Sequence, residues 1–214
     1  MLNSQMLEMD LRLKAVRRGV RLEWFTVAWM AAEAVLAIGA GVAARSVLLT
    51  AFGADSVIEL LSGATLLWRL RVESAGGDKT RVESVERRAE WVSAALLLLL
   101  CAYVLLTSIA GFAVGVEPRR SWLGVAVSAT AVIVMPWLAA RKRAANQTIQ
   151  SSALRADIAE SITCAYLAAV TLAGAAVNAI TGLWWIEYVA ALLLLRWLVP
   201  EALEALAAAR GRED

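Results

Sequence analysis

Long runs of apolar residues make up most of the chain, and short polar or charged segments separate them. A helix that crosses the hydrocarbon core of a bilayer needs about 20 consecutive, mostly apolar residues. Six stretches approach or exceed that length and predict spans at residues 22–43, 47–68, 89–115, 121–140, 152–176 and 182–199. The pattern therefore predicts an all-α integral membrane protein, a multi-pass bundle of six transmembrane helices.

The segments outside these spans are polar, so we expect residues 22–199 to form the transmembrane domain. Residues 1–21 are basic and predict a cytoplasmic N-terminal segment, either a short helix on an anionic membrane surface or a solvated lead-in. This segment has no apolar core of its own, which argues against a signal peptide. Residues 69–88 are rich in both signs of charge and predict a solvated linker. Residues 200–214 predict a short cytoplasmic tail.

Basic residues are distributed unevenly between the two sides of the predicted spans. With the N-terminus placed inside, sixteen Lys and Arg residues fall in cytoplasmic segments, whereas three lie outside: Arg45, Arg119 and Arg120. Lys and Arg that flank transmembrane helices are retained on the cytoplasmic side. Both termini are therefore predicted to be cytoplasmic, and we expect the cell membrane as the location.

The composition restricts the class of protein further. Apolar residues make up 60% of the chain and charged residues 19%, and the mean hydropathy is +0.65, values outside the range of a soluble domain. The chain has no histidine, which excludes imidazole ligands and His-assisted nucleophiles, and it has no Gly-rich phosphate loop. Cys101 and Cys164 both lie inside spans, which excludes a disulfide framework. We expect neither an enzyme nor a nucleic-acid-binding protein.

Acidic residues inside the spans are the strongest indication of function. Asp55 and Glu59 lie four positions apart in the second span, and Glu160 and Cys164 have the same spacing in the fifth. Residues four apart share one face of a helix. An ionisable group at the bilayer centre costs at least a few kcal/mol, so it is retained where it contacts a partner, water or an ion. Two such pairs facing each other would provide four ligands to a cation.

Three carboxylates and a thiol suit a divalent transition metal. Oxygen ligands favour harder ions, and sulfur favours zinc, cadmium or iron. Four ionised ligands would exceed the charge of the metal, so we expect protons to bind when the metal leaves, which predicts metal–proton exchange. Alternatively, a buried acid pairs with Arg155 or Arg196, and a membrane cysteine is a small apolar filler.

Three stretches carry a resemblance to the cation diffusion facilitator family, and together they cover most of the chain. The second span of that family, with its four-residue ligand spacing, resembles SVLLTAFGADSVIELLSG. The fifth span, with its ADxxHxxxD-like motif, resembles SSALRADIAESITCAYLAAV. The sixth span and its exit are similar to GLWWIEYVAALLLLRWLVPEALEAL.

The resemblance implies a transmembrane metal site formed by Asp55, Glu59, Glu160 and Cys164. Glu160 stands in the histidine position of the family motif, and Cys164 stands in the position of its last aspartate. Both departures change the hardness, charge and geometry of the ligand set. The metal is therefore open among zinc, manganese, iron and cadmium.

Three further acids take positions that the resemblance connects with the ion path. Glu187 falls at the outer start of the sixth span, and Glu33 lies where some relatives carry a polar group in the first. Alternatively, Glu187 is a favourable charge near a helix N-terminus. Asp157 follows the AD dipeptide of the family and is expected to support the site or to line an inner vestibule.

The function implied is export of a divalent transition metal from the cytoplasm in exchange for protons. The family's usual cytosolic C-terminal domain is absent from the sequence, so we expect any homodimer to form through the spans. Two alternatives remain: a non-transporting metal-binding scaffold or accessory subunit, and a proton-coupled exporter of organic cations that uses Glu33 and Asp55.

Overall fold

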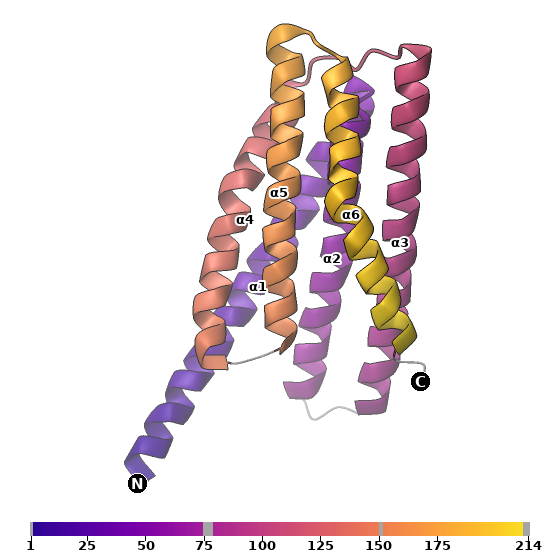
Figure 1. Cartoon of the computed structure of the whole chain (residues 1–214). Coiled ribbons are helices and arrows are strands. Elements are labelled where there is room, and N and C mark those ends of the chain that lie inside the picture. Colours follow the sequence, from indigo (N-terminus) through magenta and orange to yellow (C-terminus); the bar gives the residue numbers. More distant parts are fainter. Residues whose placement is uncertain (1, 75–78, 150–151, 212–214) are drawn as a thin grey trace.

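The computed structural model describes residues 2–74, 79–149 and 152–211, and the described chain is an all-α bundle (Figure 1). Its helices are α1 (Leu2–Ala44), α2 (Val47–Ser74), α3 (Lys79–Val114), α4 (Trp122–Ile149), α5 (Ser152–Thr181) and α6 (Trp185–Gly211). Each predicted span lies within one helix or passes the end of that helix by no more than about three residues. The predicted fold class is therefore confirmed.

Within the described residues, five helices are long and apolar enough to cross a membrane. These stretches are Arg17–Ala44, Val47–Thr65, Trp91–Val114, Trp122–Thr148 and Asp157–Thr181. The sixth predicted span lies in α6, whose apolar run is interrupted by Glu187 and Arg196. Length and composition thus bear out five of the predicted spans, and the crossing by α6 stays a prediction.

The helices run alternately up and down, so the N-terminus of α1 and the C-terminus of α6 lie at the same end of the bundle (Figure 1). We call this end the terminal end and the opposite one the far end. Helices α2 and α4 also end, and α3 and α5 also begin, at the terminal end. Helix α1 packs mainly on α2 and α4, α4 on α5, and α3 on α6. Which end faces the cytoplasm stays a prediction from the basic residues.

Close packing between α1 and α2 depends on glycines. A Cβ atom placed on Gly53 would lie 2.7 Å from the backbone nitrogen of Ile38, and one on Gly41 would lie 2.6 Å from the backbone nitrogen of Thr50. Small residues allow helix backbones in a bilayer to approach closely, because packing rather than hydrophobic burial drives their association. The position of α2, which carries Asp55 and Glu59, is thus set by contact with α1.

Apolar side chains fill the centre of the bundle and also cover its outside. The core includes Met30, Leu48, Phe52, Leu167 and Leu194. Large apolar side chains are exposed on the outer faces of the helices, among them Val35, Leu99, Leu106, Ile133 and Ile180. A surface of this kind suits contact with lipid chains.

The segments outside the spans are more helical than the sequence predicted. Residues 2–21 continue directly into α1, so they do not form a separate short helix. The predicted linker 69–88 is largely helix, because α2 extends to Ser74 and α3 starts at Lys79; its residues 75–78 lie outside the described residues. The predicted tail continues α6 past Pro200 to Gly211, and residues 212–214 are outside the described part. Charged residues are compatible with helix beyond the apolar core.

Candidate metal site

Helix α2 presents Asp55 and Glu59 to a large open cavity, which we call the vestibule. Its volume is about 560 Å³. The wall is formed by α2, α3, α5 and α6, and it includes Glu160 and Arg196. The vestibule extends to Ala208 near the C-terminal end of α6, and so it reaches toward the terminal end. Three of the four predicted ligands therefore border one cavity.

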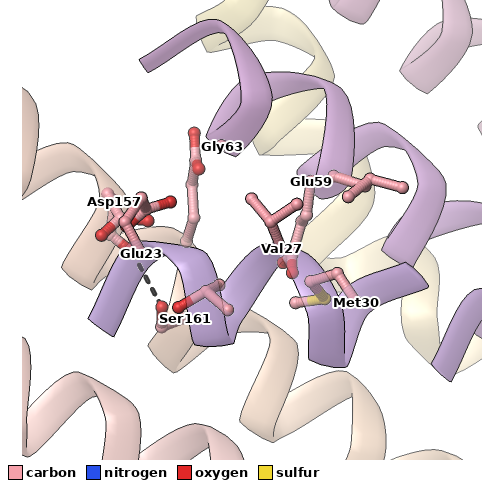
Figure 2. Close-up of a pocket in the computed structure, with 10 residues that line it drawn as sticks. Glu23, Val27, Met30, Glu59, Gly63, Asp157 and Ser161 are labelled. Carbon is pink, nitrogen blue, oxygen red and sulfur yellow. Dashed lines mark hydrogen bonds between the residues drawn. The ribbon is translucent and has the colours of Figure 1, made fainter. Parts of the chain in front are cut away.

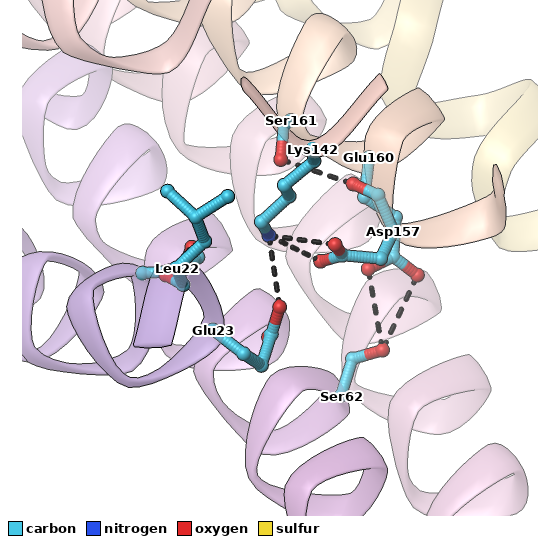
Figure 3. Close-up of polar contacts among 8 residues, drawn as sticks. Leu22, Glu23, Ser62, Lys142, Asp157, Glu160 and Ser161 are labelled. Carbon is cyan, nitrogen blue, oxygen red and sulfur yellow. Dashed lines mark hydrogen bonds and ion pairs between the residues drawn. The ribbon is translucent and has the colours of Figure 1, made fainter. Parts of the chain in front are cut away.

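Glu160 is oriented by a serine on the neighbouring helix. The hydroxyl of Ser62 on α2 lies 3.2 Å from Oε1 and 3.3 Å from Oε2 of Glu160 on α5. Figure 3 shows this contact between the two helices. The same carboxylate borders a second, much smaller cavity of about 10 Å³.

The smaller cavity lies between α1, α2 and α5. Its wall includes the carboxylate-bearing residues Glu23, Glu59, Asp157 and Glu160. In Figure 2, Glu23 and Asp157 lie on one side of it and Glu59 on the other. Glu59 and Glu160 border both cavities, so the small cavity adjoins the vestibule through these two residues.

Cys164 lies deeper than the other predicted ligands. It is completely buried, and it is not part of the vestibule wall. Its Sγ lies 3.8 Å from Oε1 of Glu33, and it also interacts with the side chain of Glu59. The structure thus places the thiol beside the acid pair of α2, on the side that faces α1.

Glu33 is held by neutral donors. The indole Nε1 of Trp29 donates to its Oε2 at 2.7 Å, and the hydroxyl of Ser56 donates to its Oε1 at 2.7 Å. Glu33 is 1% exposed and does not border the vestibule. Its carboxylate therefore lies behind the acid pair of α2, within reach of Cys164.

The described residues contain no group of three or more Asp, Glu, Cys or His side chains close enough together to hold a metal ion as they stand. The four predicted ligands are neighbours rather than a closed coordination shell. One oxygen of Glu59 is buried and has no hydrogen-bond partner among the described residues. Such an oxygen is available to a cation, since a buried carboxylate is otherwise costly to leave unpaired.

Glu187 lies at the far end of the bundle, away from the vestibule. It is in the first turn of α6 and 2% exposed. It accepts a hydrogen bond from the hydroxyl of Ser46 and another, of 2.6 Å, from Nδ2 of Asn178. These contacts join α5 and α6 to Ser46, which lies between α1 and α2. At the end of α1, the carbonyl of Ala44 accepts a hydrogen bond of 2.7 Å from the backbone N–H of Arg119. A network of polar contacts therefore connects several elements at the far end.

Asp157 does not border the vestibule, because a lysine holds it. The ammonium of Lys142 lies 2.7 Å from its Oδ1 and 2.6 Å from its Oδ2, and 3.0 Å from Oε2 of Glu23 (Figure 3). By its position in the sequence, Lys142 falls in a predicted cytoplasmic connection, and Glu23 is not among the predicted site residues. Glu23 is an acid inside the first predicted span, and that signal was available.

Two acids of α6 were also missed. Glu201 and Glu204 line the vestibule, because α6 continues beyond Pro200. Burial and the neighbouring carboxylate of Glu204 raise the pKa of Glu201. Together with three predicted ligands, they give the vestibule wall five acidic residues beside Arg196, as expected for a surface that attracts cations.

The sequence of this helical bundle matches the model of a known domain. The model of the cation efflux transmembrane domain matches residues 24–209. The chain belongs to this family. Among curated proteins, none is similar enough in sequence to count as a match.

Membership of the cation efflux family supports the predictions of cation transport, of a divalent cargo and of a multi-pass membrane protein. The protein is a cation transporter of the diffusion facilitator type, in a family of transporters rather than enzymes. Its cargo is a divalent cation, and its apolar helices place it in a bilayer as a multi-pass protein. The match spans residues 24–209, which include all or part of each of the helices α1 to α6, so the predicted resemblance is confirmed.

Proposed function

We propose that the chain binds a divalent transition metal at Asp55, Glu59, Glu160 and Cys164 and exports it from the cytoplasm in exchange for protons. The observation that carries this proposal is the vestibule, because Asp55, Glu59 and Glu160 all lie in the wall of this one cavity. Cys164 lies directly behind them. Zinc, manganese, iron and cadmium are the candidate cargoes.

The charges of the site support exchange with protons. Three carboxylates and a thiol without a bound cation would leave several negative charges in a poorly hydrated interior. Protons neutralise these groups when the metal departs, and metal binding releases them again. The vestibule extends toward the terminal end, which the basic residues predict to be cytoplasmic. The structure thus supports a state that receives metal from the cytoplasm.

The test uses purified protein in proteoliposomes loaded with a cation-sensitive dye, with manganese, iron, zinc and cadmium supplied in turn. Transport is expected for at least one of these ions and is expected to respond to an imposed pH gradient. Indifference to the gradient would contradict proton exchange. A complete lack of metal transport by folded protein would favour a non-transporting scaffold or accessory subunit.

Loss of ligand charge tests the site itself. Asp55→Asn and Glu59→Gln each remove a negative charge with little change in volume, so we expect at least a hundredfold loss of transport from either variant. Thermal unfolding is expected to stay close to that of the unmodified chain. Asp10→Asn is the control, because Asp10 precedes the first predicted span and is far in sequence from the residues that line the vestibule. Full transport by either ligand variant would remove that residue from the site.

The size of the vestibule favours a second candidate function. A volume of about 560 Å³ lies within the range of pockets that hold drug-sized molecules. Trp197 and Leu97 give its wall an apolar part beside the acids. A proton-coupled exporter of organic cations would use such a surface. Dye-labelled or radiolabelled organic cations in the same vesicles distinguish the two, because a metal transporter is expected to leave them outside.

Two further predictions stay untested. We expect a homodimer formed through the spans, and we expect the cell membrane as the location. Cross-linking in native membranes and fractionation of membranes would check each in turn.

A further inference from the structure

The side chain of Lys142 is completely buried inside the bundle. Its ammonium is surrounded by carboxylate oxygens from two other helices: both oxygens of Asp157 on α5 at 2.7 and 2.6 Å, and Oε2 of Glu23 on α1 at 3.0 Å (Figure 3). We call Glu23, Lys142 and Asp157 the lysine cluster. A buried lysine is retained only with partners of this kind, because its unpaired charge is very costly in a bilayer.

The lysine cluster has more acids than bases. It contains two carboxyl groups and one amine, and one carboxyl oxygen does not contact the amine. Oε1 of Glu23 is buried and has no hydrogen-bond partner in the described part of the chain. Glu23 as a whole is 2% exposed. This side chain borders the small cavity of about 10 Å³, which has room for a particle the size of one water molecule.

The small cavity connects the lysine cluster to the ligands of the transport site. Glu59 and Glu160 complete its wall. Asp157 and Lys142 both act electrostatically on Glu160, with opposite signs. The ammonium therefore offsets a negative charge that would otherwise act directly on a predicted metal ligand.

We propose that Glu23 and Asp157 form a second cation position beside the transport site and that the ammonium of Lys142 is its permanent occupant. Lys142 is thus a residue that determines specificity. It keeps Asp157 from coordinating the cargo, and it limits the bundle to one metal ion. The cargo assignment rests on the proposed function, but the existence of the second position does not.

The ammonium of Lys142 occupies this position permanently because it is attached to the chain and cannot be exchanged for another cation. A metal ion that displaced the ammonium would leave a lysine charge buried without a partner. Without the lysine, Glu23 and Asp157 would face each other across the place of the ammonium, with oxygen ligands that suit a hard divalent ion such as Mn²⁺. Removal of the lysine should therefore create a metal site rather than merely weaken the protein.

The experiment measures the number of Mn²⁺ ions bound by the full chain in detergent, by equilibrium dialysis. Lys142→Met keeps an unbranched apolar stem and removes the charge, so it is expected to bind one more Mn²⁺ per chain than the unmodified protein. Lys142→Arg keeps the charge and is expected to show no gain. The triple variant Lys142→Met, Glu23→Gln, Asp157→Asn removes the extra ligands and is expected to return to the original number.

Each result decides the proposal. A folded Lys142→Met variant with the original number of bound ions overturns it, and so does a triple variant that keeps the additional ion. If Lys142→Met fails to fold while the triple variant folds, the unpaired carboxylates are the cause. Expression in Mn²⁺-supplemented medium is then expected to restore folding of Lys142→Met, and failure of Mn²⁺ to do so overturns the proposal as well.

A ligand-free background separates this proposal from the proposed function. Asp55→Asn with Glu59→Gln is expected to remove metal from the transport site. Lys142→Met added to that background is still expected to gain one Mn²⁺. Unchanged binding in the double variant would count against the transport site alone, and no gain on adding Lys142→Met would count against the second position alone.

Discussion

The Sγ atom of Cys164 lies 3.8 Å from Oε1 of Glu33, so a thiol on α5 and a carboxylate on α1 meet in the middle of the bundle. The contact lies next to the acid pair of α2, since Cys164 also interacts with Glu59 and the Ser56 hydroxyl donates to Glu33. Sequence spacing paired Cys164 with Glu160 on one helix face. The tertiary structure adds Glu33 as its neighbour across the bundle.

Replacement of this thiol tests whether it binds the cargo. Cys164→Ser keeps the size of the side chain and exchanges a soft ligand for a hard one. We expect cadmium and zinc transport to fall about tenfold or more relative to manganese, because sulfur favours the softer ions. Competition between cadmium and manganese in proteoliposomes measures the ratio.

Cys101→Ser is the control, since this half-buried cysteine lies on α3 outside the proposed ligand set. An unchanged cadmium-to-manganese ratio in Cys164→Ser would make the buried thiol a packing residue.

The hydroxyl of Ser62 positions the carboxylate of Glu160. Ser62→Ala removes the donor to both of its oxygens, so we expect metal affinity to fall about tenfold, as is usual when a group that orients a ligand is lost. Calorimetric titration with the transported metal measures this loss.

A second hydroxyl on α2 provides the control for Ser62. Thr65 donates to the carbonyl of Leu61 within its own helix, so Thr65→Ala should leave the affinity unchanged. Equal losses in both variants would contradict a role of Ser62 in orienting Glu160.

The approach of α2 to α1 depends on the missing side chain of Gly53. A methyl group there would lie 2.7 Å from the backbone nitrogen of Ile38, and backbone cannot move aside as a flexible side chain does. We expect Gly53→Ala to lower the free energy of unfolding by about 1–3 kcal/mol. Thermal or denaturant unfolding in detergent measures the change.

Gly39 is the matched control on α1, because a Cβ there would meet nothing within 4 Å. Gly39→Ala is expected to be neutral or to stabilise by about 0.5–1 kcal/mol through helix propensity. A stable Gly53→Ala variant would show that the two helices can separate without cost.

The network around Glu187 should stabilise the far end without contributing to metal binding. Glu187→Ala leaves the hydroxyl of Ser46 and the amide of Asn178 without their acceptor, so we expect a loss of about 1–3 kcal/mol in stability. Metal affinity at the vestibule, measured by calorimetry, is expected to be unchanged.

The exposed Glu117 near the same end provides the comparison. Its replacement by Ala should alter neither quantity. A large loss of metal affinity in Glu187→Ala would instead make this acid a ligand on the ion path.

The periodicity and length of the apolar runs were sufficient to predict the helical bundle, and they place Asp55, Glu59, Glu160 and Cys164 within its helices. Spacing along a helix decides which residues share a face. A charged side chain in hydrocarbon is costly, so each acidic residue within a span is expected to have a polar or ionic partner. Glu201 and Glu204 are not among the predicted site residues because Pro200 indicates the end of the sixth span. In the structure, α6 continues past Pro200 to Gly211.

The sequence by itself determined that this is a membrane bundle with acids in its interior, because burial of apolar residues in lipid depends on composition and period alone. Only the tertiary structure decided the partners of those acids. Lys142 is 119 positions from Glu23 in the chain but 3.0 Å away in space, and it had been counted among the cytoplasmic charges. Contacts between helices depend on their rotation and on close approaches such as Gly53 to Ile38, which no pattern within one helix specifies.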